Sequence, residues 1–370
     1  MIKRRVATGA SYGALAKDEY AREAVKNAIA KMRPCTVGSV LLFLSNAYAH
    51  APQNAIKEAA KAAGTPLVFG CCAMGLLTEE EWLLDVEGAV AMVFPQDLSM
   101  QPLRVLRPQG LDPSLVFTLA SPNAAEMAIN SCNSPQFGSV TTDEYGQGPY
   151  SIWQSGRIVE QEFCQTAFSN KLQTRLVLAE GVERLSPIMQ VNRTDGNNLL
   201  EVNLQGASDN ISNYVSVASP FDLFCAVSET NNPESINQGY YQLIHVLEVD
   251  AKANVVSLAD EIKAGRHIFW ARRNIDSAQA SIQDQLTNAK QSLTKEPEFG
   301  LMFANMTRGP EFFGGVDMDL EAFKKAFPGT PLIGIYGNAE IAPGFSVPAL
   351  QRHHATVSVL FAWYSAFYRS

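Results

Sequence analysis

The sequence predicts an α/β fold made of two related halves, each a mixed or largely antiparallel sheet covered by helices. The main observation is a strand, helix and strand pattern near each end of the chain. Apolar strands at 40–44 and 300–304 precede helices over 53–63 and 318–327. Both helices lead into a return strand through the same residue types, Gly64-Thr65-Pro66-Leu67 and Gly329-Thr330-Pro331-Leu332. This repetition indicates two related units whose glycine-rich loops converge.

The segments between these repeats complete the two halves. Apolar residues recur at helical spacing from 21 to 32, which predicts an amphipathic helix that ends before Pro34. The middle of the chain has the pattern of short antiparallel strands joined by tight turns, so we reject a doubly wound Rossmann sheet. A boundary near 185–187 divides the 370 residues into two domains of ordinary size, 1–185 and 186–370.

Composition and charge narrow the class of protein. A formal net charge of −8 argues against a nucleic-acid partner, and the basic run at 3–5 is too short to change that. The chain lacks a hydrophobic signal core, and its longest apolar stretches are far shorter than a bilayer span. We therefore expect a cytoplasmic protein without a membrane span. The six cysteines are scattered, which favours reduced thiols over a disulfide framework.

The first glycine-rich loop is a candidate ligand site. Gly70 and Gly75 bracket a turn in which backbone N–H groups can face a cavity. Between them, Cys71, Cys72 and Met74 offer soft side-chain contacts. The structural alternative is that the two cysteines are small buried hydrophobic residues at a strand end.

The second loop supplies the polar candidates. Arg308, beside Gly309 after a strand, suits the two-pronged recognition of a carboxylate. Tyr336, Asn338 and Glu340 lie on the return strand, where Glu340 could accept a hydrogen bond from a ligand amine. The structural alternative for Arg308 is an ion pair with Glu340 or Asp317.

Two further groups of residues are candidates for ligand or haem contacts. Trp270 and Arg272 could form an aromatic wall with a basic rim, although a single tryptophan on a strand is more often part of the core. If 352–363 is a strand, His353 lies on its apolar face and His354 on the other. His353 is then the better axial ligand for haem, but a satisfied core histidine is the commoner outcome.

Enzyme signatures are missing from the sequence. It contains no Gly-x-Ser-x-Gly elbow, Walker A loop, Rossmann glycine fingerprint or His-Glu-x-x-His motif. A cysteine-dependent enzyme that uses Cys71 or Cys72 with one of the five histidines is the remaining catalytic alternative. Such an enzyme requires a cysteine of depressed pKa. We therefore expect a protein without catalytic residues.

The order and wording of these segments resemble the FIST family, which pairs a FIST-N with a FIST-C domain, over nearly the whole chain. In the C-terminal half the resemblance rests on Arg308-Gly309 and on a return of the family's type, Gly334-Ile335-Tyr336-Gly337-Asn338-Ala339-Glu340-Ile341-Ala342-Pro343. In the N-terminal half it rests on Gly70-Cys71-Cys72-Ala73-Met74-Gly75. The chain departs from the family at Ala339, where glycine is usual, and at Leu76, where glutamate is usual.

The resemblance implies a small-molecule sensor of bacterial signal transduction, with ligands such as amino acids or other small acidic molecules. Some members of the family bind haem and act as nitric-oxide sensors that regulate a histidine kinase, which makes haem the alternative ligand here. Because 364–370 is only a short tail, the signal is expected to pass to a separate protein partner, such as a histidine kinase.

Overall fold

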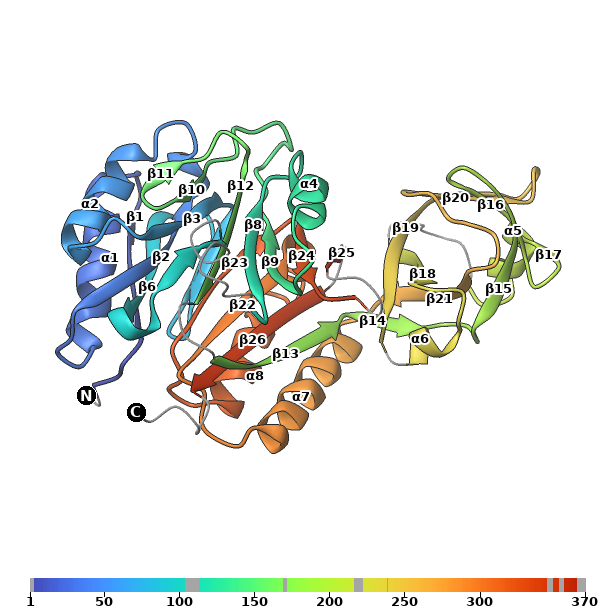
Figure 1. The fold of residues 1–370 in the computed structure, drawn as a ribbon. Helices are drawn as coiled ribbons and strands as arrows, with labels where there is room; N and C mark the ends of the chain where they lie inside the picture. Colours follow the sequence, from blue (N-terminus) through green and yellow to red (C-terminus); the bar gives the residue numbers. More distant parts are fainter. Residues whose placement is uncertain are drawn as a thin grey trace.

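The chain folds into a body of three sheets and a smaller lobe of strands (Figure 1). Helices lie on the outside of the body, so the structure confirms a mixed α/β protein. Among the described helices, none combines the length and apolar character needed to cross a membrane. The computed structural model describes residues 3–103, 113–168, 172–215, 222–237, 239–344, 349–352 and 356–364.

The first unit of the body occupies residues 7–95 and contains the first predicted strand, helix and strand pattern. Its central strand β2 pairs in parallel with β3 and antiparallel with β6, and β6 pairs with β1. Helix α1 buries Ala21, Ala24, Val25 and Ala28, the apolar stripe that the sequence predicted. The elements are β1 (Ala7–Gly13), α1 (Asp18–Lys31), β2 (Val37–Ser45), α2 (Gln53–Ala63), β3 (Val68–Ala73), β4 (Gly75–Thr78), β5 (Trp82–Leu83) and β6 (Glu87–Pro95).

The third unit repeats this connectivity. Strand β22 pairs in parallel with β23 and antiparallel with β26, and β26 pairs with β13. The predicted recurrence of strand, helix and strand is therefore confirmed in its connectivity. The elements are β13 (Leu172–Glu180), α7 (Ile275–Ser292), β22 (Phe299–Asn305), the 3-10 turn η5 (Met306–Arg308), α8 (Met318–Ala326), β23 (Leu332–Gly337), β24 (Ala339–Ala342), β25 (Leu350–Arg352) and β26 (Thr356–Tyr364).

A second unit, which the sequence did not reveal as a copy, lies between these two. Strand β8 pairs in parallel with β9 and antiparallel with β12, and β12 pairs with β7. The order of pairing is the same as in the other two units. The elements are β7 (Met100–Pro102), β8 (Val116–Ala120), α4 (Ala125–Asn130), β9 (Gln136–Val140), β10 (Ile152–Gln154), β11 (Arg157–Ile158) and β12 (Phe163–Phe168).

One glycine occupies the same register in all three units. Gly70 lies opposite Leu42, Gly138 opposite Thr118 and Gly334 opposite Met302 in the parallel strand pairs. A methyl group at any of the three would lie 1.7 Å from the carbonyl oxygen of its partner. Only glycine can occupy these positions without moving the backbone, so the same constraint recurs three times.

Each unit gives a hairpin to a neighbouring sheet. The hairpin β4–β5 of the first unit joins β23 of the third, β10–β11 of the second joins β3 of the first, and β24–β25 of the third joins β9 of the second. We call these the exchanged hairpins. They close a cycle, so the three sheets form one interlocked body.

The inner faces of the three sheets share one core. The ring of Phe303, from the third unit, lies 6.3 Å from Phe43 of the first unit. It also lies 5.8 Å from Phe117 and 5.3 Å from Phe137 of the second unit. These fully or almost fully buried rings explain why the central strands are apolar on both faces, since helices cover the opposite side.

The smaller lobe is a closed antiparallel barrel inserted between β13 and α7. Six strands pair in a ring, β21-β15-β16-β20-β19-β18 and back to β21. The interior is filled by apolar side chains, including Trp270. The elements are β14 (Val182–Arg184), β15 (Met189–Asp195), β16 (Asn198–Val202), β17 (Gln205–Gly206), α5 (Ala207–Ser212), β18 (Leu223–Ser228), α6 (Glu234–Asn237), β19 (Tyr241–Asp250), β20 (Val255–Leu258) and β21 (His267–Arg273).

The predicted boundary near residue 185 lies where the chain enters the barrel through β14. The division into domains 1–185 and 186–370 stays a prediction.

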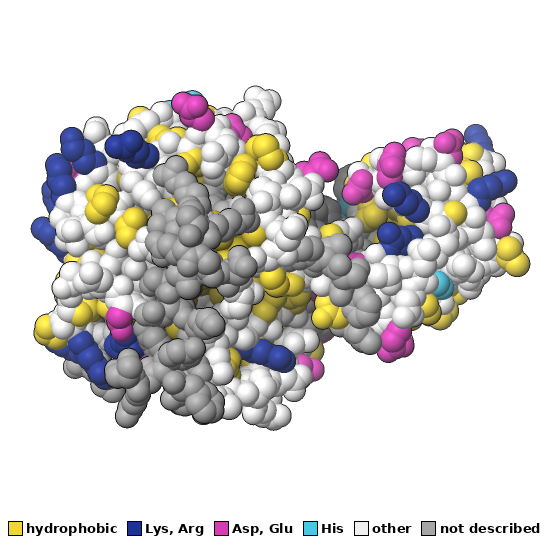
Figure 2. All heavy atoms as spheres, in the orientation of Figure 1, with side chains coloured by type: hydrophobic (Ala, Val, Ile, Leu, Met, Phe, Trp, Pro, Cys, Tyr) yellow, Lys and Arg dark blue, Asp and Glu magenta, His cyan; other side chains and the backbone are white. Residues whose placement is uncertain are grey.

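On the face of the molecule drawn in Figure 2, the basic side chains form small separate groups, interspersed with acidic and uncharged residues.

Candidate functional site

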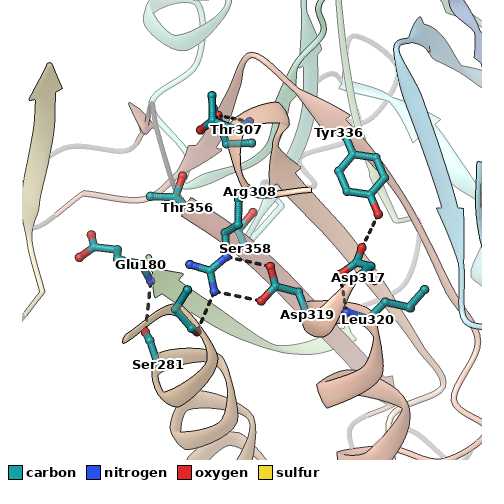
Figure 3. Close-up of polar contacts among 12 residues, drawn as sticks. Glu180, Ser281, Thr307, Arg308, Asp317, Asp319, Leu320, Tyr336, Thr356 and Ser358 are labelled. Atoms are coloured by element: carbon teal, nitrogen blue, oxygen red, sulfur yellow. Dashed lines mark hydrogen bonds and ion pairs between the residues drawn. The ribbon is translucent and has the colours of Figure 1, made fainter. Parts of the chain in front are cut away.

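Arg308 lies in a buried ion pair in the third unit. Its side chain is 0% exposed. Its Nε donates to Oδ2 of Asp319 at 2.8 Å and its Nη2 to Oδ1 of the same carboxylate at 2.9 Å (Figure 3). Nη2 also donates to the carbonyl oxygen of Ala278 on α7 at 3.0 Å. The predicted structural partners, Glu340 and Asp317, are therefore wrong, because the two-pronged contact is made with Asp319 on α8.

Asp317 and Tyr336 form a second polar contact beside this pair (Figure 3). The Tyr336 hydroxyl donates to the Asp317 carboxylate. Asp317 also caps α8, since its Oδ1 accepts the backbone N–H of Leu320 at 2.9 Å. Burial, with the neighbouring Asp319 charge, raises the pKa of Asp317 to about 6. Burial raises the pKa of Tyr336 well above its usual value, so its hydroxyl stays protonated and donates.

The Tyr336 ring lies close to Gly75 and Gly309, two glycines that the sequence analysis placed in the candidate ligand site. A methyl group at Gly75 would lie 2.5 Å from the ring, and one at Gly309 would lie 3.4 Å from it. Tyr336 and Gly75 are also directly paired between β23 and β4. Glycine at 75 is thus explained by the close approach of the Tyr336 ring and of the Leu84 side chain, which would lie 2.4 Å from the same methyl group.

The three units meet where strands β3, β9 and β23 lead into the exchanged hairpins. The Thr141 hydroxyl of the second unit donates to the carbonyl oxygen of Cys72 in the first. The Asn338 N–H of the third unit donates to the carbonyl oxygen of Val140 in the second at 2.8 Å. The pairing of Tyr336 with Gly75 completes the circle. The two glycine-containing segments therefore lie side by side as predicted, but most of their residues belong to strands β3, β4, β23 and β24 rather than to a loop, and ligand binding there stays a prediction.

The remaining residues of these loops differ in exposure. Asn338 is exposed and its carbonyl oxygen accepts Nδ2 of Asn305 at 2.7 Å, while Met74 is half-buried. Glu340 is fully buried and its carboxylate accepts a hydrogen bond from the Thr356 hydroxyl. Of these three residues, Asn338 is the one that is exposed to solvent.

Cys71 and Cys72 are buried thiols near the end of strand β3, so the structure shows the structural alternative for them rather than an open loop. Cys71 is 0% exposed and Cys72 is 2% exposed. Burial raises the pKa of Cys71 to about 12 and that of Cys72 well above its usual value. A thiol with a raised pKa is a poor nucleophile at neutral pH, which argues against the cysteine-dependent enzyme. All six cysteines are free, as the sequence predicted.

Trp270 and Arg272 lie in the barrel, away from the loop residues of the body. The Trp270 ring is fully buried and its Nε1 donates to Oδ1 of Asn210 at 2.8 Å. Arg272 forms a half-exposed ion pair with Glu183 at 3.0 Å. Trp270 thus has the core environment that was its commoner alternative. His353 and His354 lie outside the described residues, and within the described ranges no three His, Cys, Asp or Glu side chains cluster as metal ligands.

Two surface cavities are lined mostly by residues that the sequence analysis did not propose for a site. One, of about 590 Å³, contains Pro66, Gln154 and Arg157. The other, of about 370 Å³, contains Arg4, Lys31, Lys324 and Pro331 among its lining residues. The available signal was the repeated Gly-Thr-Pro-Leu turn, because each cavity includes the proline of one copy.

The pKa of Asp317 gives a prediction for the pH dependence of stability. Its folded value, about 6, exceeds the usual 3.8, so its contribution to stability is present below pH 4 and is lost as pH rises through 6. A difference of about two pKa units is worth about 3 kcal/mol. Asp317→Asn, which keeps a good capping residue, should therefore gain about 3 kcal/mol over the wild type between pH 4 and pH 7 in denaturant unfolding. A difference between the two proteins that is constant with pH would contradict this assignment.

Comparison with known proteins places the chain among sensory domains. A model of the FIST N domain matches residues 39–205, and a model of the FIST C domain matches residues 207–343. The F-box only protein 22 of Pongo abelii is 26% identical over 170 residues, which make up 42% of this chain and 37% of that protein. The chain thus spans little more than a third of the length of this curated relative.

Proposed function

The chain belongs to the FIST family, and on that premise we propose that it is a small-ligand-binding sensory protein that acts on a separate output partner. FIST domains are sensory domains of signal transduction. The observation that carries the proposal is the pair of adjacent family matches, which together extend from residue 39 to residue 343. An amino acid or another small acidic molecule is the proposed ligand, and a signalling protein such as a histidine kinase is the proposed partner.

A haem-binding gas sensor is the second candidate function. It depends on His353, because the sequence pattern puts this histidine on the apolar face of its strand. We rank it second because no other histidine or cysteine has a ligand spacing that supports it.

One pair of measurements separates the two candidates. Thermal unfolding is recorded with each of the amino acids and a set of small carboxylates, and absorption spectra are recorded with added haemin. A ligand present at 100 times its Kd should stabilise the protein by about 2.7 kcal/mol, seen as a rise in Tm of a few degrees. The protein without added haemin should show no Soret band. No stabilising small ligand, together with a strong Soret band that His353→Ala abolishes, would reverse the ranking.

A further inference from the structure

The two cavities occupy the same place in two different units. In each cavity, the tip of an exchanged hairpin lies against the Gly-Thr-Pro-Leu turn that precedes β23 or β3. The Glu79 N–H on the β4–β5 hairpin donates to the Leu332 carbonyl oxygen at 3.2 Å, and the Gly156 N–H on the β10–β11 hairpin donates to that of Val68 at 2.9 Å. Equivalent positions thus form a cavity between the third and first units and another between the first and second. Because the two cavities are equivalent in position, a difference between their lining residues indicates a difference in what each can bind.

The cavity between the third and first units is rich in charge. We call it the charged cavity. Arg4 precedes β1, Lys31 ends α1 and Lys324 comes from α8, so three separate segments each bring a cation to it. In the equivalent cavity between the first and second units, the basic lining residue is Arg157, and the polar residues Gln154, Ser155 and Gln161 lie beside it.

The acidic residues of the charged cavity are already engaged. Glu80 pairs with Lys31 at 2.7 Å. Lys324 pairs with Glu321, outside the lining, at 2.9 Å, and because these two side chains are 32% and 51% exposed, the pair is a weak one that a ligand can displace. The Glu79 carboxylate accepts the Thr8 hydroxyl at 2.5 Å and the Leu332 N–H at 3.0 Å, and burial raises its pKa. Among the described residues, no carboxylate lies within ion-pair distance of Arg4. Its guanidinium lies against the turn at Gly329, where a methyl group would be 2.4 Å from Nη2.

The size and the remaining walls of the charged cavity favour an organic ligand. Its volume of about 370 Å³ lies within the lower part of the range of small-molecule sites. Phe327 and Pro331 contribute apolar wall beside the three cations. An anionic head paired with Arg4, combined with an apolar group against these walls, would satisfy both parts of the lining.

We propose that the charged cavity binds a small organic anion, a carboxylate or phosphate monoester that carries an apolar group, with Arg4 and Lys324 holding the anionic head. The inference deepens the proposed sensory function, on which it rests, by naming the ligand class and its place. Because Arg4 lies just before β1 of the first unit and Lys324 lies on α8 of the third, such a ligand would bridge two units of the interlocked body.

The probes are phenyl phosphate and benzoate, with benzamide as the uncharged control, titrated calorimetrically into the full chain at low salt. We expect at least one of the two anions to bind and benzamide not to bind. Arg4→Gln and Lys324→Gln should each raise the Kd at least tenfold, and Arg4→Lys should raise it less than Arg4→Gln. Arg157→Gln, in the equivalent cavity, should leave the Kd within twofold of the wild-type value. The comparison of the two anions decides between a phosphate and a carboxylate head.

Three outcomes would overturn the inference. One is that neither anion binds; another is that Arg157→Gln weakens binding as much as Arg4→Gln does. The third is that Arg4→Gln and Lys324→Gln both leave the Kd unchanged in proteins whose melting temperatures match the wild type. If a small acidic ligand from the thermal screen still binds in these variants, the proposed function survives and only this location fails. Lys324→Gln keeps the test open if Arg4→Gln does not fold.

Discussion

Replacing Arg308 by alanine is expected to lower the free energy of unfolding by about 3–5 kcal/mol, because it leaves the Asp319 carboxylate buried without its cation. The two side chains are 0% and 1% exposed, so water cannot compensate for the lost partner. The change also removes the donor to the Ala278 carbonyl, which links η5 to α7. Denaturant unfolding of the wild type and the variant measures the effect.

Arg272→Ala is the matched control. Arg272 pairs with Glu183 at 3.0 Å, but its side chain is 48% exposed and that of Glu183 is 41% exposed. An exposed pair of this kind contributes about 0–1 kcal/mol. The double change Arg308→Met with Asp319→Leu should recover much of the loss, since it removes both buried charges and keeps apolar volume. If Arg308→Ala costs no more than Arg272→Ala, the buried pair has no special weight.

A further variant, Arg308→Lys, bears on the predicted role of Arg308 as a ligand anchor. In the structure its Nε and Nη2 already donate to Asp319, so an acidic ligand group would have to compete with that carboxylate. Arg308→Lys keeps the charge but cannot reproduce two parallel hydrogen bonds. Weaker ligand binding in Arg308→Lys at unchanged stability would support the anchor, whereas lost stability at unchanged affinity would assign the residue to the fold.

The repeat was the part of the fold that the sequence could predict. The first and third units share a long apolar strand, a helix and the Gly-Thr-Pro-Leu turn, which are local patterns. The second unit was missed as a copy because its corresponding helix, α4, is only six residues long and no such turn follows it. Exchange of hairpins between sheets leaves no local trace, since β4 looks the same whether it pairs with its own unit or with β23.

The site was predicted less well than the fold, for a physical reason. Asp317 and Asp319 are both acidic residues at the start of α8, and the sequence does not show which of them reaches Arg308. In the structure Arg308 pairs with Asp319, and the Tyr336 hydroxyl donates a hydrogen bond to Asp317. The charged cavity was harder still, because it joins side chains from residue 4 to residue 331 that no spacing rule connects.

Gly334→Ala is expected to destabilise the protein by more than about 3 kcal/mol, or to prevent folding. The new methyl group would lie 1.7 Å from the Met302 carbonyl oxygen, within the parallel pair β22–β23. Both strands are buried on both faces, so neither can move aside without disturbing the shared core. Soluble yield, melting temperature and denaturant unfolding measure the effect.

Two further variants test whether the effect comes from the close approach of the paired strands. Gly309→Ala is the control, because its methyl group would lie 3.4 Å from the Tyr336 ring, an ordinary contact, and should cost less than about 1 kcal/mol. Gly138→Ala, at the equivalent register of the second unit, should cost about as much as Gly334→Ala, because the distance to the opposing carbonyl is the same 1.7 Å. A tolerant Gly138 beside an intolerant Gly334 would mean that the second unit does not share the close strand packing of the third, and that the repeat is one of connectivity alone.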